Sequence, residues 1–196
     1  MTLKPLALAA LLAVGAAAHA AETAPPLPAP AGLPFPIDVG GDYLLTDHRG
    51  QPRTQVDPDG RMQLVFFGYA NCQQICSVAL PLMGEVAEAL QAEGLSVTPV
   101  MITVDPQNDT LQNMGPALRM HHPDFVGLTG TEAQLEHTYD LFSVERTLIF
   151  EDPEFGPIYA HGSHIYLMDA KGDFLTLLPP ILAPERVTEI VTSYAD

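Results

Sequence analysis

The chain has 196 residues, a length that suggests one domain with a short appendage, and 47% of them are apolar, which is enough for a sizeable core. The chain is strongly acidic, with 8 Lys and Arg against 24 Asp and Glu and a formal net charge of −16. This balance excludes most nucleic-acid-binding roles, which need clustered basic residues, and it argues against docking on anionic membranes.

The first twenty residues resemble an export signal. Lys4 supplies a positive start, residues 6–17 form an apolar core, and Ala18-His19-Ala20 fits a small-x-small cleavage site. This core is shorter and richer in alanine than a typical membrane span of ~20 residues, and an uncleaved anchor is the alternative. We therefore expect a periplasmic protein, attached to the inner membrane only if residues 1–20 are retained.

Residues 21–36 are rich in proline and alanine, which predicts an extended tether before a globular domain over residues 37–196. The domain is expected to open with a hairpin over residues 40–54, in which Asp47-His48-Arg49-Gly50 forms the turn. The dense apolar run over residues 63–67 then predicts a buried strand.

From this strand onward, helical and strand patterns alternate. A helix is predicted from the apolar face between Ile75 and Leu90, ending at Gly94. The later predicted elements are a strand over 97–104, a helix from Asn108 or Asp109 to about Met120, a strand over 125–128, a helix from Thr131 to about Phe142, a hairpin that pairs 165–168 with 174–178, and a helix over 183–194. This order predicts an α/β fold with helices on both faces of a mixed sheet.

The two cysteines stand at the first strand-to-helix junction. Cys72 and Cys76 are spaced Cys-x-x-x-Cys at a predicted helix N-terminus, where unpaired N–H groups and the helix dipole favour a thiolate. In an exported protein such a pair can form a disulfide, act as a redox pair or bind one soft metal ion. A purely structural disulfide is the weaker interpretation, because it would close a very short loop and add little stability.

Several motifs resemble those of the SCO/SenC family of thioredoxin-fold copper proteins. Residues 67–77 resemble the family pattern Phe-Gly-[Phe/Tyr]-Thr-x-Cys-Pro-x-x-Cys-Pro, and His161 lies five residues before Tyr166-Leu167, as the ligand histidine of the family does. Further similar segments are 40–43, 45–47, 103–106 with Asp109-Thr110, and 126–130. The resemblance implies a thioredoxin-like mixed sheet with the first hairpin as an N-terminal extension.

The chain departs from the family pattern at five positions, four of them in the cysteine motif. Gln73 and Ser77 stand where the family has prolines, Ala70 replaces its threonine, and Gln74 replaces a frequent acidic residue. Ala160 replaces the aspartate that usually precedes the histidine. These side chains shape the site without binding the metal, so they bear on affinity and redox behaviour rather than on ligand identity.

The resemblance implies that Cys72, Cys76 and His161 bind one copper ion. Two sulfurs and one imidazole suit Cu(I) in a three-coordinate site, or Cu(II) with a fourth ligand, whereas a structural zinc would want a fourth protein ligand. The resemblance also implies a metallochaperone without a turnover reaction of its own. It would help to build the dinuclear copper centre of cytochrome c oxidase subunit II, or supply another copper-site apoprotein.

Two other functions stay open. In the first, Cys72 and Cys76 are the redox pair of a thiol-disulfide oxidoreductase that keeps the cysteines of a partner reduced. Thioredoxin-like reductases usually carry Cys-x-x-Cys and a cis-proline before the late strand. Here the two cysteines are one residue further apart and residues 158–168 contain no proline, and both features argue against this function. The second alternative is a redox or copper sensor that acts on a signalling partner.

The remaining histidines and the acidic run 151–154 are interpreted as structural or solvated. His164 is not expected to be a co-ligand, because on a strand its side chain would face away from that of His161. The acidic run is expected to form a solvated loop, although it could steer a basic partner. Four histidines are expected at the surface, namely His48, His121, His122 and His137.

Overall fold

A computed structural model describes residues 38–72 and 74–195, so the predicted export signal and tether lie outside the described residues. The strands are β1 (Leu45–Asp47), β2 (Pro52–Arg53), β3 (Met62–Gly68), β4 (Val97–Thr103), β5 (Val126–Thr129), β6 (Thr147–Asp152), β7 (Gly156–Ala160), β8 (Ile165–Met168) and β9 (Phe174–Leu178). The helices are α1 (Cys76–Ala92), α2 (Leu111–Arg119), α3 (Glu132–Leu141) and α4 (Pro184–Thr192). None of these helices is long and apolar enough to span a membrane.

Seven strands form a mixed sheet in the order β2-β1-β5-β4-β3-β8-β9, and β6 and β7 form a separate pair. Strand β3 lies near the centre, parallel to β4 and antiparallel to β8. The first hairpin adds to the edge of the sheet, because β1 pairs antiparallel with both β2 and β5. The predicted mixed sheet, including the N-terminal hairpin, is therefore confirmed.

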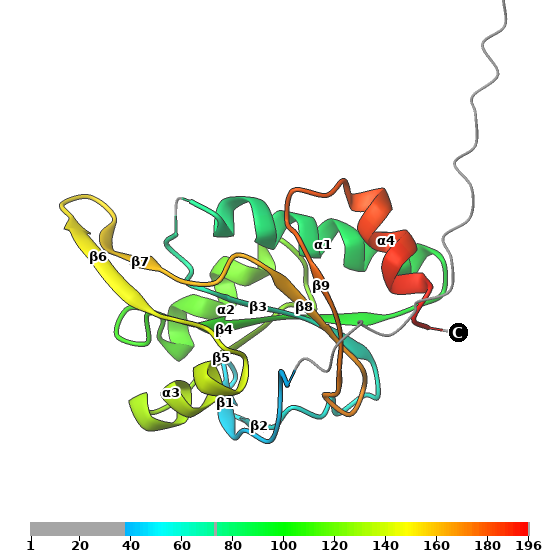
Figure 1. Cartoon of the computed structure of the whole chain (residues 1–196). Helices are drawn as coiled ribbons and strands as arrows, with labels where there is room; N and C mark the ends of the chain where they lie inside the picture. The colour runs from blue at the N-terminus through cyan, green and yellow to red at the C-terminus, as the bar shows by residue number, and fades with distance from the viewer. Residues whose placement is uncertain (1–37, 73, 196) are drawn as a thin grey trace, which may run out of the picture.

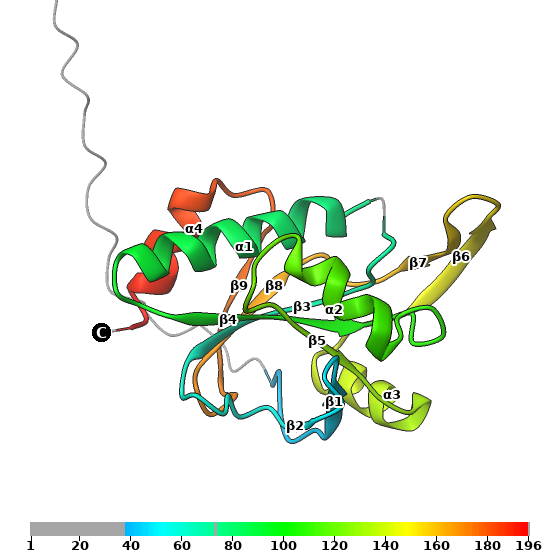
Figure 2. The ribbon, with the colours of Figure 1, turned by 180° about the vertical axis from the view of Figure 1, so that it is seen from behind.

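Helices cover both faces of this sheet, as predicted (Figures 1 and 2). From β3 to β4 and from β4 to β5 the chain moves across the sheet in the same direction. Connections between parallel strands are right-handed, so the two connecting helices, α1 and α2, lie on the same face. Helix α4 packs against α1 on that face. The other face carries α3, since Phe67 of β3 packs on Tyr139 of α3 at 6.0 Å between ring centroids. Strand β3 is consequently buried on both sides.

The close approach of α2 to the sheet requires a glycine in β5. A Cβ atom at Gly127 would lie 2.6 Å from the sulfur of Met114 and 2.7 Å from a methyl carbon of Leu118, both on α2. Helix α2 begins one or two residues later than predicted, because its N-cap is Thr110 rather than Asp109 or Asn108. Asp109 does not cap the helix, because its carboxylate accepts hydrogen bonds from the loop before the cysteines and from β4.

The hairpin formed by β6 and β7 was not predicted from the sequence. It extends away from the main sheet (Figure 1), and the acidic run expected to be a loop forms the end of β6 and part of its turn. The β6 side chains are almost all exposed, including those of Leu148, Ile149 and Phe150. A strand without a buried face has no reason to alternate apolar and polar residues, so its sequence carries no period-two signal.

Two histidines expected at the surface are buried. The Nδ1 atom of His48 accepts a hydrogen bond from the backbone N–H of Gly127 at 3.1 Å, and burial lowers the pKa of its ring. The Nδ1 atom of His122 accepts one from the backbone N–H of Asp124 at 3.2 Å. Both rings therefore satisfy backbone donors, a use that the sequence pattern does not reveal.

Candidate metal centre

The two cysteines lie where the loop after β3 enters α1. Cys76 is the first residue of α1, and Cys72 precedes it in a turn closed by the bond from its own N–H to the carbonyl of Tyr69 at 3.2 Å. Both side chains are buried, and both thiols are free. The buried end of β3 and the start of the helix therefore hold two sulfur atoms away from bulk water.

Hydrogen bonds to two other parts of the chain fix this loop. The backbone N–H of Ala70 donates to both carboxylate oxygens of Asp109, at 3.1 and 3.2 Å, and the hydroxyl of Thr103 donates to one of them at 2.7 Å. Burial raises the pKa of Asp109 to about 6, because the carboxylate is removed from water. The amide of Asn71 donates to the carbonyl of Phe155 at 2.8 Å, which joins the loop to the turn between β6 and β7.

His161 reaches the cysteines from the segment between β7 and β8. Its half-buried ring packs edge-on against Phe66 and Tyr69, each at 5.9 Å between ring centroids. Its Nδ1 atom lies 2.9 Å from the carbonyl oxygen of Gly162, which can only accept, so Nδ1 carries the proton. The lone pair of Nε2 is thus left free for a hydrogen-bond donor or a metal ion.

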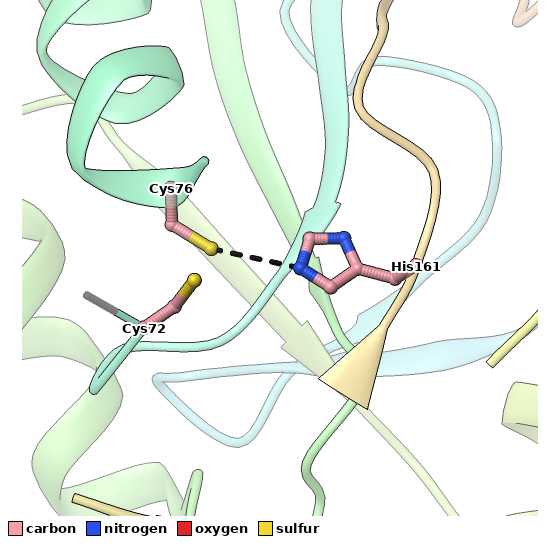
Figure 3. Close-up of side chains that lie close together, drawn as sticks. All are labelled: Cys72, Cys76 and His161. Carbon is pink, nitrogen blue, oxygen red and sulfur yellow. Dashed lines mark hydrogen bonds between the residues drawn. The ribbon is translucent and has the colours of Figure 1, made fainter. Parts of the chain in front are cut away.

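The three side chains converge (Figure 3). The Sγ atom of Cys76 lies 3.9 Å from Nε2 of His161, and one donor atom from each of the three residues lies within 4.8 Å of the other two. Over residues 38–72 and 74–195, this is the one group of three or more His, Cys, Asp or Glu donors close enough to hold a metal ion. Its two soft sulfurs and one imidazole form a cluster that can bind copper.

The two thiols differ in acidity. A hydrogen bond from the thiol of Cys76 lowers the pKa of Cys72, because it stabilises the thiolate of Cys72. Serving as that donor raises the pKa of Cys76, and burial raises it further. The pair therefore offers one thiolate readily, whereas a metal ion must displace the proton of Cys76.

The sequence predicted the three clustered residues but not the side chains that support them. His164 is exposed and lies outside the cluster, as predicted, although it belongs to a loop and not to a strand, since β8 begins at Ile165. The roles of Asn71 and Asp109 were missed, because their partners are 84 and 39 residues away in the chain. The one sequence signal for Asp109 was that Asp109-Thr110 is among the segments that resemble the family.

Comparison with known proteins agrees with this description. The family profile SCO1/SenC matches residues 32–196. A SCO2-like protein of Rickettsia felis is 33% identical over 157 residues, which cover 79% of this chain and 76% of that protein. Copper-bound ScoI of Bradyrhizobium japonicum superposes with a TM-score of 0.71 at 28% identity, covering 80% of this chain and 99% of that one. Copper-bound yeast Sco1 superposes with a TM-score of 0.73 at 26% identity, covering 81% of this chain and 89% of that one. These likenesses confirm the thioredoxin-like fold.

Proposed function

Because the chain belongs to the SCO1/SenC family, we propose that it holds one copper ion on Cys72, Cys76 and His161 and delivers it to cytochrome c oxidase. The recipient would be the dinuclear copper centre of subunit II, or else another copper-site apoprotein. The observation that supports this proposal most directly is the convergence of two buried thiols with an imidazole 85 residues further along the chain. The family is one of copper-binding proteins related to cytochrome c oxidase assembly.

The chemistry of the site suits a carrier. Two thiolates and a neutral imidazole match the preference of Cu(I) for soft ligands, and three ligands leave a position at which an incoming ligand can begin exchange. The hydrogen bond from Nδ1 to Gly162 holds the ring in the tautomer that exposes Nε2. The chain's own residues therefore position all three donor atoms before the ion arrives.

We further propose that the protein works outside the cytoplasm. The export-like residues 1–20 support this location, and retention of that segment would attach the protein to the inner membrane. In an oxidising compartment the two thiols must be kept reduced or metal-bound to stay available for copper.

A competition titration with a Cu(I) chelator tests the copper-binding proposal. The reduced wild type should bind about one Cu(I) per chain, as expected of one soft-ligand site. Loss of a supporting residue around a metal typically costs 10–100-fold in affinity, so Cys72→Ser, Cys76→Ser and His161→Ala should each cost more than about 100-fold. His164→Ala is the matched control, since its ring is exposed and lies only three residues away. Unchanged affinity in His161→Ala would show that the site is assigned wrongly.

A thiol-disulfide oxidoreductase is the second candidate, and the two free cysteines, one at the first residue of α1 and one in the turn before it, favour it. A thiolate on Cys72 could attack a partner disulfide, and Cys76 could then resolve the mixed disulfide, so that the partner gains two electrons and the pair becomes a disulfide. Rapid reduction of a partner disulfide by metal-free protein would support this function. The activity should require both cysteines and persist in His161→Ala.

A further inference from the structure

A polar cavity of about 510 Å³ lies beside the loop that carries Cys72. The loop before the cysteines, the segment after β4, helix α2 and the β6-β7 turn all contribute to its wall. Its polar lining consists of Asn71, Asp105, Asn108, Asp109, Asn113 and Glu154. We call this cavity the Asp105 pocket, and it contains none of the three proposed copper ligands. Its volume is in the range of pockets that bind small groups.

Asp105 in this pocket is a buried carboxylate that forms no ion pair with any residue the structure describes. Its residue is only 3% exposed, and one carboxylate oxygen accepts a single hydrogen bond, from the amide of Asn108 at 2.8 Å. The other oxygen is buried and has no hydrogen-bond partner among the described residues. A buried carboxylate with one unpaired oxygen is costly, so a donor from outside the chain that reached it after a rotation of the Asp105 side chain would stabilise it.

A second aspartate shows what this fold provides when a buried carboxylate has a structural role. Asp57 is also 3% exposed, but its oxygens accept from the hydroxyl of Thr98 at 2.7 Å and from the backbone N–H groups of Asp59 and Arg61. Arg53 and Arg61 lie 3.7 and 3.6 Å from it. Asp57 is thus compensated by other residues of the chain, whereas the described residues 38–72 and 74–195 leave one oxygen of Asp105 unpaired.

The lining of the pocket selects a cation that donates hydrogen bonds. Three carboxylates line it, those of Asp105, Asp109 and Glu154, and no Lys, Arg or His does so. A guanidinium group carries one positive charge and five N–H donors in a planar fork, so it can satisfy a carboxylate and amide oxygens together.

We propose that the Asp105 pocket receives an arginine side chain of the protein that exchanges copper with this one, a proposal that rests on the proposed function. The pocket adjoins the copper site, because Ala70 and Asn71 line it and Cys72 follows directly. The hairpin that closes the pocket also exposes Leu148, Ile149 and Phe150 by 49, 59 and 50%. Exposed apolar side chains on the element that carries a charged anchor are typical of a protein interface, in which arginine is a frequent hot spot.

An NMR titration of the reduced, metal-free full chain with N-acetyl-arginine methylamide tests this proposal. Saturable shifts are expected at the backbone amides of Ala70 and Asn108, and the citrulline analogue, which has the same shape without the charge, should produce none. Because Asp105→Asn removes the charge from the hydrogen bond, it should weaken binding about tenfold or more. Glu154→Gln, an exposed change that leaves the core intact, should weaken it as well, whereas Glu151→Gln outside the pocket should not.

Three results would overturn the proposal. The first is equal shifts with the arginine and citrulline probes, or no saturable shift with either. The second is unchanged arginine binding in both Asp105→Asn and Glu154→Gln. The third is displacement of the arginine probe by equimolar Mg²⁺, which would make the pocket an inorganic cation site. Copper titration of the wild type and the same variants separates the two proposals. A wild type that binds no copper would contradict the proposed function, whereas the result with the arginine probe would be unaffected.

Discussion

At the scale of single residues, the candidate metal centre depends on close packing around one imidazole and two sulfurs. The ring of His161 is held between Phe66 and Tyr69, and its Nδ1 proton is committed to the next carbonyl. Cys72, Cys76 and His161 could be predicted because each carries chemistry and matches a motif. The supporting bonds of Asp109 could not be predicted, because they depend on the packing of distant segments.

Gly68 at the end of β3 offers a test of this packing. A Cβ atom there would lie 3.1 Å from the sulfur of Cys76 and 2.7 Å from a ring carbon of Phe66. We expect Gly68→Ala to lower the free energy of unfolding by about 1–3 kcal/mol, measured by urea denaturation, and to weaken copper binding. Gly162→Ala is the control, since its added methyl would meet nothing nearer than 3.8 Å. Equal effects of the two changes would contradict the described packing.

Asp109 should make stability depend on pH in a defined direction. Its pKa is about 6 in the folded chain against 3.8 for the free group, so the folded state binds its proton more tightly. The resulting stabilisation is complete below about pH 4 and is lost as the pH rises through about 6. The gap between these pKa values corresponds to about 3 kcal/mol. Relative to Asp109→Asn, the wild type should therefore lose up to this free energy of unfolding between pH 4 and pH 7, and parallel pH profiles would refute the assignment.

At the scale of elements, the β6-β7 hairpin connects the two halves of the candidate site. Asn71 joins its turn to the cysteine loop, and β7 leads directly into the segment that carries His161. Helices and buried strands could be predicted from their periodicity and caps, as the capping box formed by Thr131 and Gln134 at the start of α3 confirms. The hairpin could not be predicted, because its exposed side chains follow no period.

Arg146, just before β6, anchors this hairpin to the body of the protein. Its guanidinium donates to the carbonyl of Val104 and to Glu132, and lies 4.7 Å from the ring centroid of Tyr159 on β7. We expect Arg146→Met to lower the free energy of unfolding by about 1–3 kcal/mol and to weaken Cu(I) binding by less than His161→Ala does. Hydrogen exchange should become faster in residues 147–160. Arg186→Met, which breaks only an exposed pair on α4, should change neither property.

At the scale of the whole molecule, the sheet brings the start of α1 and the segment before β8 together, because β3 and β8 are neighbours. The alternating order of elements predicted helices on both faces, but periodicity alone does not say which distant loop meets the cysteines. The family-like motifs supplied that link for His161.

Copper should stabilise the entire fold, because the proposed ligand His161 lies far along the chain from the proposed ligands Cys72 and Cys76. A ligand that binds only the folded state adds RT ln(1 + [L]/Kd), which is about 2.7 kcal/mol when the free ion is at 100 times its Kd. Thermal unfolding of the reduced protein should therefore move to a higher midpoint with Cu(I) and return to the metal-free value with excess chelator. His161→Ala should show a much smaller increase than His164→Ala, and equal increases would count against a site that joins the two segments.

X-ray absorption spectroscopy of the Cu(I)-loaded protein addresses the coordination directly. Cys72, Cys76 and His161 together predict two sulfur scatterers and one nitrogen scatterer around a single copper, with the nitrogen contribution lost in His161→Ala and kept in His164→Ala. A spectrum that is the same in the wild type and in His161→Ala, with copper bound by sulfur alone, would contradict the account.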